Sequence, residues 1–310
     1  MKRPVLIIAL VAACAPAEPR PLTPNTFAFA VFGDGPYRPI EAGSFRRLIE
    51  DVNRSDVAWF LHVGDILSGS CSDEKLAGML VQLNTIRHPV IYTPGDNEWT
   101  DCHRRSFKPL ERLQRIRATY FKDPTRSIAG PAMAVESQSG NPAWREFVEN
   151  VRWRRGGFLF VTTHMVGSFN GTSRFAARTA ADDSAVVRRT AAALAWIDSA
   201  FAIATADSLS GVVIALHANP RLHRSGEHVF APLVRRIAEH AASFRGEVLL
   251  IHGDTHEYTV DHPLKRVGTD EVLTNFTRLE TFGSPDIGWV RVVVDTVAGR
   301  FVEFEPRRVR

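Results

Sequence analysis

The chain has 310 residues, of which 45% are hydrophobic and 23% are charged, and its formal net charge is +4. This composition is typical of a globular protein with a large core, and no segment has the ~20 apolar residues in a row that a membrane-spanning helix needs. The charge excess is small and no cluster of Lys and Arg is interleaved with aromatic residues, so the sequence does not indicate a nucleic-acid partner.

The N-terminus has the layout of a secretory signal. Basic "MKRP" precedes the apolar run "VLIIALVAA", and small residues lead to Cys14. We therefore expect residues 1–13 to be a signal peptide. Its removal deletes two basic residues and no acidic ones, so the net charge falls to 36 − 34 = +2.

The stretch "VAAC", which ends at Cys14, resembles a bacterial lipobox, in which the cysteine is acylated. On this interpretation residues 14–26, rich in proline, form a tether, and the protein is exported to the periplasm and anchored by lipid to the outer membrane. Plain cleavage near the same position is the alternative.

Strand-like and helix-like runs alternate from Phe27 onward. The expected strands are residues 27–32, 57–63, 89–93, 157–164, 211–217 and 246–254, and the expected helices are residues 41–52, 74–86, 109–121, 183–205 and 230–244. The opening βαβαβ order indicates strands with helical crossovers in an α/β fold.

Two regions depart from this alternation. Residues 122–156 are rich in Gly, Pro and Ser and are expected to form an excursion or cap. From Val272 onward the chain alternates polar and apolar residues, with "VAGR" as a turn, which predicts that the chain ends in antiparallel β-strands.

The sequence shows no repeat and no second domain boundary, so residues 27–310 are interpreted as one domain.

If Cys14 carries a lipid, one pair of cysteines remains. Cys71 lies six residues after Asp65, and Cys102 lies six residues after Asp96, in loops that look equivalent. Because disulfides persist in exported proteins, we expect a Cys71–Cys102 disulfide. Two buried free thiols are the alternative.

Acidic and histidine side chains follow the ends of five predicted strands. Asp34, Asp65 and Asp96 each follow a glycine, His217 ends a later strand, and "GDTH" at residues 253–256 ends another. In open α/β sheets the carboxyl ends of the strands form the ligand site. Gly-Asp is also a common turn dipeptide, but clustered carboxylates must be paired or bind metal, so the pattern favours a metal site.

The order and spacing of these motifs resemble the calcineurin-like metallophosphoesterases, from about Phe27 to about Tyr258. The resemblance implies a β-sandwich of mixed sheets flanked by helices, in four α/β/β/α layers. It also implies two divalent ions that activate a water against a phosphate ester. The metal ligands carried over by position fall into three roles: Asp34 and His256 for one ion, Asp65 as the bridge, and Asp96, His217 and Asp254 for the other.

The chain departs from the family pattern at four positions. Pro36 stands where a His is usual, Asp96 and Asn97 replace Asn and the catalytic His, and Asp254 replaces a His. Four carboxylates now give −4, so two divalent ions leave the site neutral instead of at +2. This oxygen-rich set favours Mn²⁺, Mg²⁺, Ca²⁺ or iron over Zn²⁺.

Phosphate attraction at a neutral site needs other donors. We expect Arg38, Arg104 and His164 to contact substrate, and Asn97 and His103 to act in catalysis, with His103 as the replacement imidazole. Tyr37 is a candidate for an unusual ligand.

The sequence therefore predicts an exported metal-dependent phosphoesterase that hydrolyses phosphate mono- or diesters. The alternative is a metal-binding scaffold lipoprotein with the same fold and reduced catalysis.

Overall fold

The computed structural model describes residues 21–224 and 226–309. The predicted signal peptide at residues 1–13 and the lipidation site at Cys14 lie outside the described residues. Leu22, within the predicted tether, already packs against the core.

The strands and helices alternate in the first part of the chain, as predicted. The strands are β1 (Thr26–Phe32), β2 (Phe60–His62), β3 (Val90–Tyr92), β4 (Glu136–Ser137), β5 (Val151–Arg155), β6 (Phe158–Thr162), β7 (Gly211–Ala215), β8 (Glu247–His252), β9 (Thr259–Asp261), β10 (Phe276–Glu280), β11 (Gly288–Asp295) and β12 (Arg300–Arg308). The α-helices are α1 (Ala42–Arg54), α2 (Asp73–Leu83), α3 (Pro109–Tyr120), α4 (Gly167–Gly171), α5 (Ala180–Ala206) and α6 (Ala231–Ser243). Short 3₁₀ turns occupy Pro39–Glu41, Thr100–Arg105, Gln138–Gly140 and Pro142–Trp144.

The strands form two sheets that pack face to face. One sheet has the order β12-β11-β1-β2-β3 and the other β4-β5-β6-β7-β8-β10-β9. Aromatic side chains fill the space between them: the Phe29 ring stacks on Trp59 at a centroid distance of 5.3 Å, and Phe160 meets Trp59 edge to face at 4.8 Å. Such offset and edge-on pairs add to the stability that burial provides.

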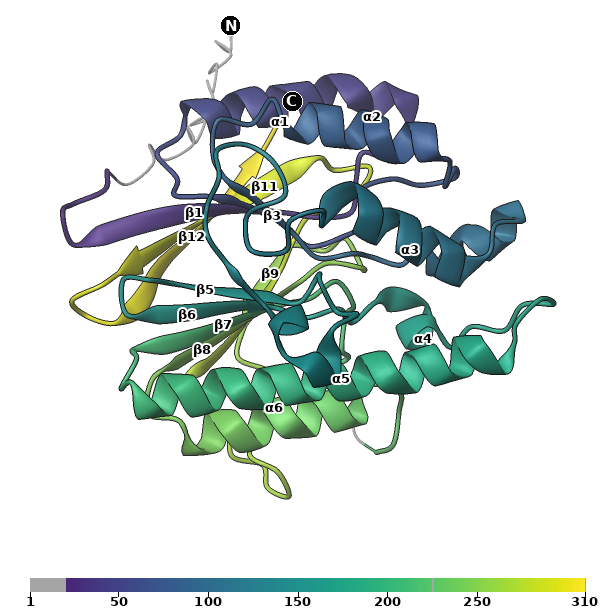
Figure 1. Cartoon of the computed structure of the whole chain (residues 1–310). Helices are drawn as coiled ribbons and strands as arrows, with labels where there is room; N and C mark the ends of the chain where they lie inside the picture. The colour runs from purple at the N-terminus through teal and green to yellow at the C-terminus, as the bar shows by residue number, and fades with distance from the viewer. Residues whose placement is uncertain (1–20, 225, 310) are drawn as a thin grey trace, which may run out of the picture.

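Helices cover the outer face of each sheet. Apolar residues of α1, α2 and α3 pack on the first sheet, and those of α5 and α6 pack on the second. Figure 1 shows the resulting layers from top to bottom: α1 and α2, the first sheet, the second sheet, and α5 with α6. The predicted four-layer α/β sandwich is confirmed.

Strand direction places the candidate site residues at one end of the sheets. β1, β2 and β3 run parallel, as do β6, β7 and β8.

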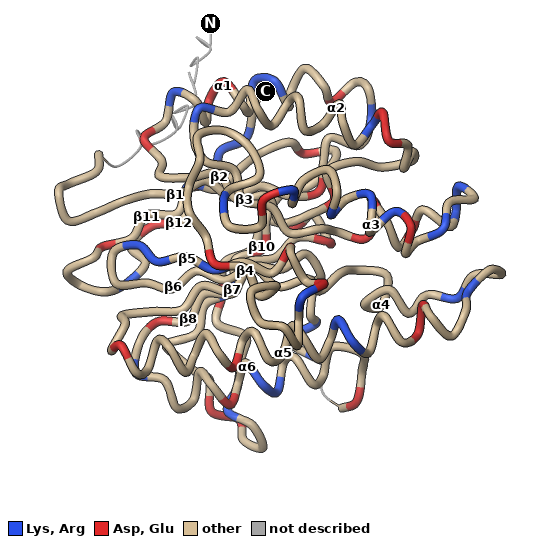
Figure 2. The backbone as a smooth tube through the Cα atoms, viewed as in Figure 1, with Lys and Arg blue, Asp and Glu red and all other residues tan. Residues whose placement is uncertain are grey.

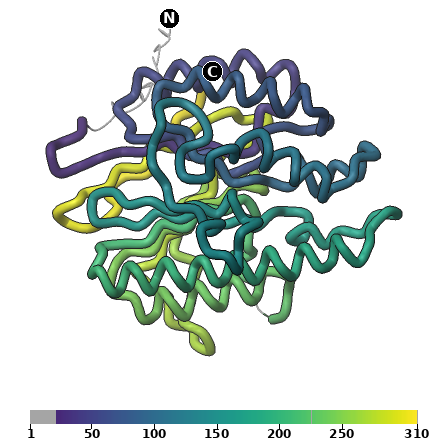
Figure 3. The backbone as a smooth tube through the Cα atoms, in the orientation of Figure 1, coloured from purple at the N-terminus to yellow at the C-terminus, as the bar shows by residue number. Residues whose placement is uncertain are grey.

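The first sheet also joins the N-terminal and C-terminal parts of the chain, because β11 pairs antiparallel with β1. Figure 3 shows the purple and yellow segments side by side.

Four strand assignments differ from the predictions. β4 and β5 both lie within the expected excursion at residues 122–156, and the arginines of β5 hide its alternation. β9 was not predicted, and it pairs antiparallel with β10. β10 itself runs parallel to β8, so only β11 and β12 form the antiparallel finish.

No helix in the described ranges is both long and apolar enough to span a bilayer. Basic and acidic positions are interspersed along the helices of Figure 2, which fits the small net charge of +4.

Candidate metal centre

The backbone bends sharply at the residues predicted to bind metal. Asp34, Asp65, Asp254 and His256 have φ values of 56°, 57°, 78° and 66°. Non-glycine residues rarely adopt positive φ, and each such residue costs on the order of 1–3 kcal/mol. Backbone strain at four neighbouring residues is typical of a functional site. Here the strained turns bring three carboxylates and one imidazole close together.

Two glycines leave room for these carboxylates. A Cβ atom on Gly95 would overlap the carboxylate of Asp65, and a Cβ on Gly253 would overlap that of Asp34. The glycine before each strand-end acid therefore allows the next turn to approach closely.

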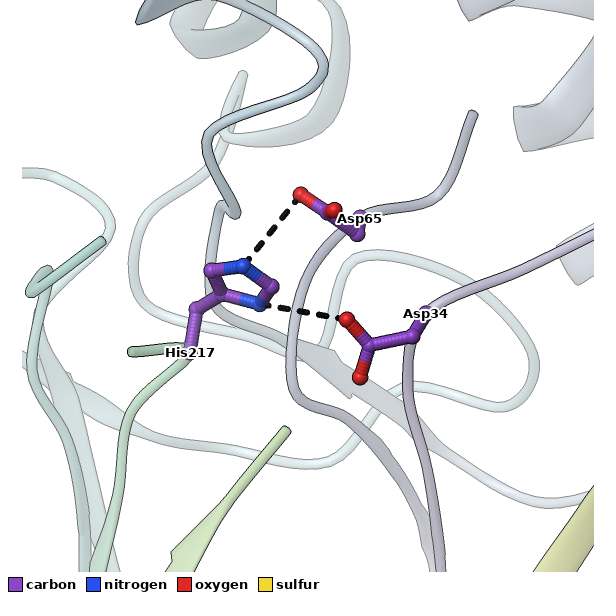
Figure 4. A group of neighbouring side chains, drawn as sticks. All are labelled: Asp34, Asp65 and His217. Atoms are coloured by element: carbon purple, nitrogen blue, oxygen red, sulfur yellow. Dashed lines mark ion pairs between the residues drawn. The ribbon is translucent and has the colours of Figure 1, made fainter. Parts of the chain in front are cut away.

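Asp34, Asp65 and His217 form the first group of candidate ligands (Figure 4). His217 Nε2 lies 3.4 Å from Asp65 Oδ1, and its Nδ1 lies 4.0 Å from Asp34 Oδ1. Asp34 and His217 are fully buried and Asp65 nearly so. His256 borders this group, with Nε2 3.5 Å from Asp34 Oδ1.

Asp96, His217 and Asp254 form the second group. His217 Nε2 lies 3.0 Å from Asp96 Oδ1 and 3.8 Å from Asp254 Oδ1. The side chain of Asp254 is 26% exposed and that of His256 28% exposed, so the centre faces solvent on their side. All six predicted ligands are thus brought together from five strand ends.

Backbone carbonyls orient both imidazoles. His217 Nδ1 lies 3.0 Å from the Val63 carbonyl oxygen, and His256 Nδ1 lies 2.7 Å from that of Ser284. An N–H at Nδ1 that donates to a carbonyl leaves the Nε2 lone pair free to bind metal, which is the usual arrangement around metal-ligating histidines.

Burial and mutual repulsion act on the carboxylates. Burial, followed by the charges of Asp96 and other acids, raises the pKa of Asp65 well above its usual value. Burial also works against a charged His217, yet the surrounding carboxylates raise the pKa of this imidazole well above 6.5. In the metal-free protein, a protonated His217 therefore offsets part of the negative charge of the surrounding carboxylates.

The donor set fits two divalent ions. Four carboxylates carry more negative charge than one imidazolium can neutralise, and burying carboxylates without a cation is costly. The two oriented imidazoles add further metal-binding atoms to this set. The second group is the one that position in the sequence indicated, whereas the first group contains His217 with Asp34 and Asp65, and the predicted ligand His256 borders it.

Asn97 and Tyr37 both contact the central carboxylate. The Asn97 side-chain amide and the Tyr37 hydroxyl each donate to Asp65 Oδ2 at 2.6 Å, and the Asn97 backbone N–H donates to Oδ1 at 3.0 Å. Burial and the charge of Asp65 raise the pKa of Tyr37 well above 10, so its hydroxyl stays protonated. The sequence suggested Tyr37 only through its place beside Pro36, and the structure brings its hydroxyl to the central carboxylate.

Glu98 fixes the backbone of the two loops that carry Asp65 and Asp96. Its Oε1 accepts hydrogen bonds from the Tyr92 hydroxyl at 2.6 Å, from the Gly95 N–H at 2.7 Å and from the Asp65 N–H at 3.2 Å. The sequence motif contained this acid, but its role in fixing the backbone of two ligand loops depends on contacts between strands that the sequence alone does not show.

The structure contradicts the predicted substrate contact of His164. This side chain is completely buried, and its Nδ1 lies 2.7 Å from Glu149 Oε1. Its ring packs edge-on against Trp99. His164 therefore belongs to a buried polar network and does not reach substrate.

The remaining predicted donors are engaged elsewhere. The His103 ring stacks on Phe175 at 4.6 Å, and its Nδ1 lies 2.7 Å from the Thr100 carbonyl oxygen, so its placement does not support a role as the replacement imidazole. Arg38 pairs with Glu41 at 2.6 Å and Arg104 with Asp101 at 2.7 Å. Both arginines are more than half exposed, but each already has an acidic partner.

The predicted disulfide is present. Cys71 and Cys102 are bonded, with their Cα atoms 5.9 Å apart, and both sulfur atoms lie within 3.5 Å of the Asn97 carbonyl oxygen. The bond ties the loop after β2 to the loop after β3, directly beside the metal centre.

The sequence profile of the calcineurin-like phosphoesterase family matches residues 28–258. No curated protein sequence matches the chain. Among solved structures, a dimetal phosphatase from Danio rerio has a TM-score of 0.50 at 13% identity, over 92% of this chain and 99% of that chain. The calcineurin-like phosphoesterase YfkN from Bacillus subtilis has a TM-score of 0.47 at 10% identity, over 91% and 89% of the two chains.

The profile match covers well over half of the 310 residues, so the chain belongs to the calcineurin-like phosphoesterase family. It is a metal-dependent phosphoester hydrolase, and the family implies a centre with two metal ions.

Proposed function

We propose that this protein is an exported, lipid-anchored phosphoesterase of the bacterial periplasm that hydrolyses small phosphate mono- or diesters. The proposed hydrolytic activity rests on one observation: two groups of candidate metal ligands lie side by side and share His217. The proposed export and outer-membrane anchor rest on the pattern of residues 1–14.

The candidate ligands have different roles around the carboxylate of Asp65. Asp34 and His256 would hold one ion, Asp96, His217 and Asp254 the other, and Asp65 would contact both. When bound, the ions supply an activated water and neutralise charge on the phosphate. The protein's part is to fix these ligands rigidly, through the carbonyls of Val63 and Ser284 and the turn held by Glu98.

Asn97 and Tyr37 serve as neutral donors. Both residues are only partly buried, and both donate to the Oδ2 atom of Asp65. We infer that both orient this carboxylate, and that Asn97, whose amide has a second N–H, offers it to a phosphate oxygen beside Asp65, the part that a histidine takes in relatives. No imidazole occupies that place among the described residues, so charge on the leaving group would be met by this weaker donor.

The ligand set also bears on the choice of metal. Four carboxylates against two imidazoles are an oxygen-rich set, and such sets favour Mn²⁺, Mg²⁺, Ca²⁺ or iron over Zn²⁺. Protein purified without chelators that holds stoichiometric zinc alone would contradict this preference.

Activity is tested with the mature full-length protein. We expect hydrolysis of aryl phosphate mono- or diesters with Mn²⁺, Mg²⁺, Ca²⁺ or iron, and its loss in Asp65→Ala. Equal, negligible rates for both proteins under every metal would overturn the enzymatic proposal and favour a scaffold role.

Export is tested separately. The full chain, expressed in a Gram-negative bacterium, should fractionate with the outer membrane, and the mass of its N-terminal peptide should show acylated Cys14. Cys14→Ser should release the protein from the membrane fraction. A wild-type protein that retains residues 1–13 in the cytoplasm would refute the localisation.

A further inference from the structure

The short α4 segment has an unusual backbone. Ser168, Phe169 and Asn170 have φ values of 48°, 56° and 58°, with ψ values of 45°, 46° and 34°. This is a left-handed turn built from three successive non-glycine residues. L-amino acids adopt it at a cost of about 1–2 kcal/mol per residue, so other interactions must hold it.

A buried arginine holds this turn. Arg189 on α5 is 2% exposed, and its guanidinium donates to Asn170 Oδ1 at 2.5 Å, to the Asn170 carbonyl at 2.7 Å and to the His164 carbonyl at 3.0 Å. Ser168 adds a hydrogen bond to Asp101 at 2.7 Å. The turn is therefore a fixed feature of the fold.

The turn lies directly against the metal centre. A Cβ atom on Gly167 would overlap the carboxylate of Asp254, two residues before Phe169. A second loop reaches the same acid, since the Asn219 N–H donates to Asp254 Oδ2 at 3.0 Å. Arg221, two residues further along this loop, also has a positive φ of 58°.

The two turns present one aromatic ring and one cation. Phe169 is 58% exposed, and among the Phe, Tyr and Trp residues of ranges 21–224 and 226–309 it is the only one that is largely exposed. The Arg221 guanidinium lies 5.9 Å from the Phe169 ring centroid, and within the described ranges it has no ion pair or hydrogen bond. Strained backbone thus keeps an apolar ring in water beside an arginine without an acidic partner.

We propose that Phe169 and Arg221 form a stacking platform for a planar aromatic group on the phosphate ester, as in a nucleoside 5′-monophosphate. An exposed phenyl face and a guanidinium plane both stack on flat rings, and the positive charge of Arg221 favours an anionic ligand. This inference rests on the proposed function, and it names the class of alcohol that the enzyme accepts.

A matched pair of ligands isolates the platform. Non-hydrolysable phosphonate analogues of adenosine 5′-monophosphate and ribose 5-phosphate differ only in the base, and their affinities can be measured by calorimetry on the Mn²⁺-loaded full-length protein. We expect the adenosine ligand to bind tighter by about five- to a hundredfold, the range that base stacking provides. Phe169→Ala should reduce this ratio to about one, and Arg221→Gln should lower it while weakening both ligands.

Two further variants separate stacking from general packing. Phe169→Trp should keep the preference because it keeps a flat ring, whereas Phe169→Leu should lose it although it stays apolar. Val187→Ala, at an exposed position of α5, is the control and should change neither affinity.

Equal binding of both ligands to wild-type protein that hydrolyses phosphate esters would overturn the platform and leave the proposed function intact. An unchanged ratio in Phe169→Ala would do the same. If the wild-type protein neither binds these ligands nor hydrolyses any phosphate ester, both proposals fail.

Discussion

Three side chains, those of Tyr37, Asn97 and His217, surround the carboxylate of Asp65. Its place after a Gly at a strand end identified it in the sequence, as it did Asp34 and Asp96. Tyr37 was harder to recognise because its hydroxyl reaches Asp65 across 28 positions of the chain.

Replacing Tyr37 by Phe removes one donor to Asp65 without changing the ligand set. We expect kcat/KM to fall by about 10- to 100-fold, the usual effect of losing a hydrogen bond to a charged group, while metal affinity changes little. Steady-state kinetics and a metal titration on the same preparation check this. A variant with full activity would show that the hydroxyl is only structural.

The pair of His164 and Glu149 predicts how stability depends on pH. Burial lowers the pKa of His164 to about 4, so folding favours its neutral form, and stability is lost as pH falls from about 6.5 toward 4. Burial opposes ionisation of Glu149, but Arg117 and His164 lower its pKa to about 2, so its contribution is lost from about 4.5 toward 2. Both losses act in the same direction.

Urea unfolding at several pH values measures this effect. Between pH 7 and pH 4.5 the unfolding free energy should fall by on the order of 2–3 kcal/mol through His164 alone. His164→Gln should have a flatter profile than the wild-type protein. Identical pH profiles for the two proteins would refute the assignment.

At the scale of elements, the strands that carry the ligands were predictable and the segments around them were not. β1, β2, β7 and β8 are buried, mostly apolar runs, and a candidate ligand follows each of them within about three residues. The left-handed turn at α4 has no glycine at its strained positions, and it forms because Arg189, from a helix later in the chain, supplies its hydrogen bonds. The sequence near Phe169 contains no sign of this.

Arg189 and its neighbour Arg188 provide a matched pair of variants. Arg189→Met leaves the buried acceptors of Asn170 and His164 without donors, and should lower the unfolding free energy by about 3 kcal/mol or more. Arg188 is half exposed and pairs with Glu146, so Arg188→Ala should cost about 1 kcal/mol or less. Thermal or urea unfolding of both variants tests the difference, and equal losses would contradict it.

The disulfide gives a second prediction at this scale. Changing Cys71 and Cys102 together to Ser frees the loops after β2 and β3, and should cost about 2–4 kcal/mol of stability. Activity should fall as well, because both sulfur atoms lie against the carbonyl of Asn97. A reduced wild-type protein should behave like the double variant, and full activity in either would show that the bond does not support the site.

At the scale of the whole molecule, the alternation of strands and helices predicted the α/β class, and the family resemblance predicted the two-sheet sandwich. The pairing of β10 with β8 and the place of β5 between β4 and β6 could not be read from local patterns, since they depend on which strands meet in space. The same topology explains the site: parallel strands from both sheets end at one edge, and residues 220 positions apart become neighbours.

The claim that the centre binds two metal ions through Asp65 is tested most directly by titrating Mn²⁺ into chelator-treated protein by calorimetry. The account predicts two ions per chain, with proton release as His217 gives up its proton, and fewer or much weaker sites in Asp65→Ala. Absence of saturable binding in the wild-type protein, or the same stoichiometry and affinity in both proteins, would contradict it.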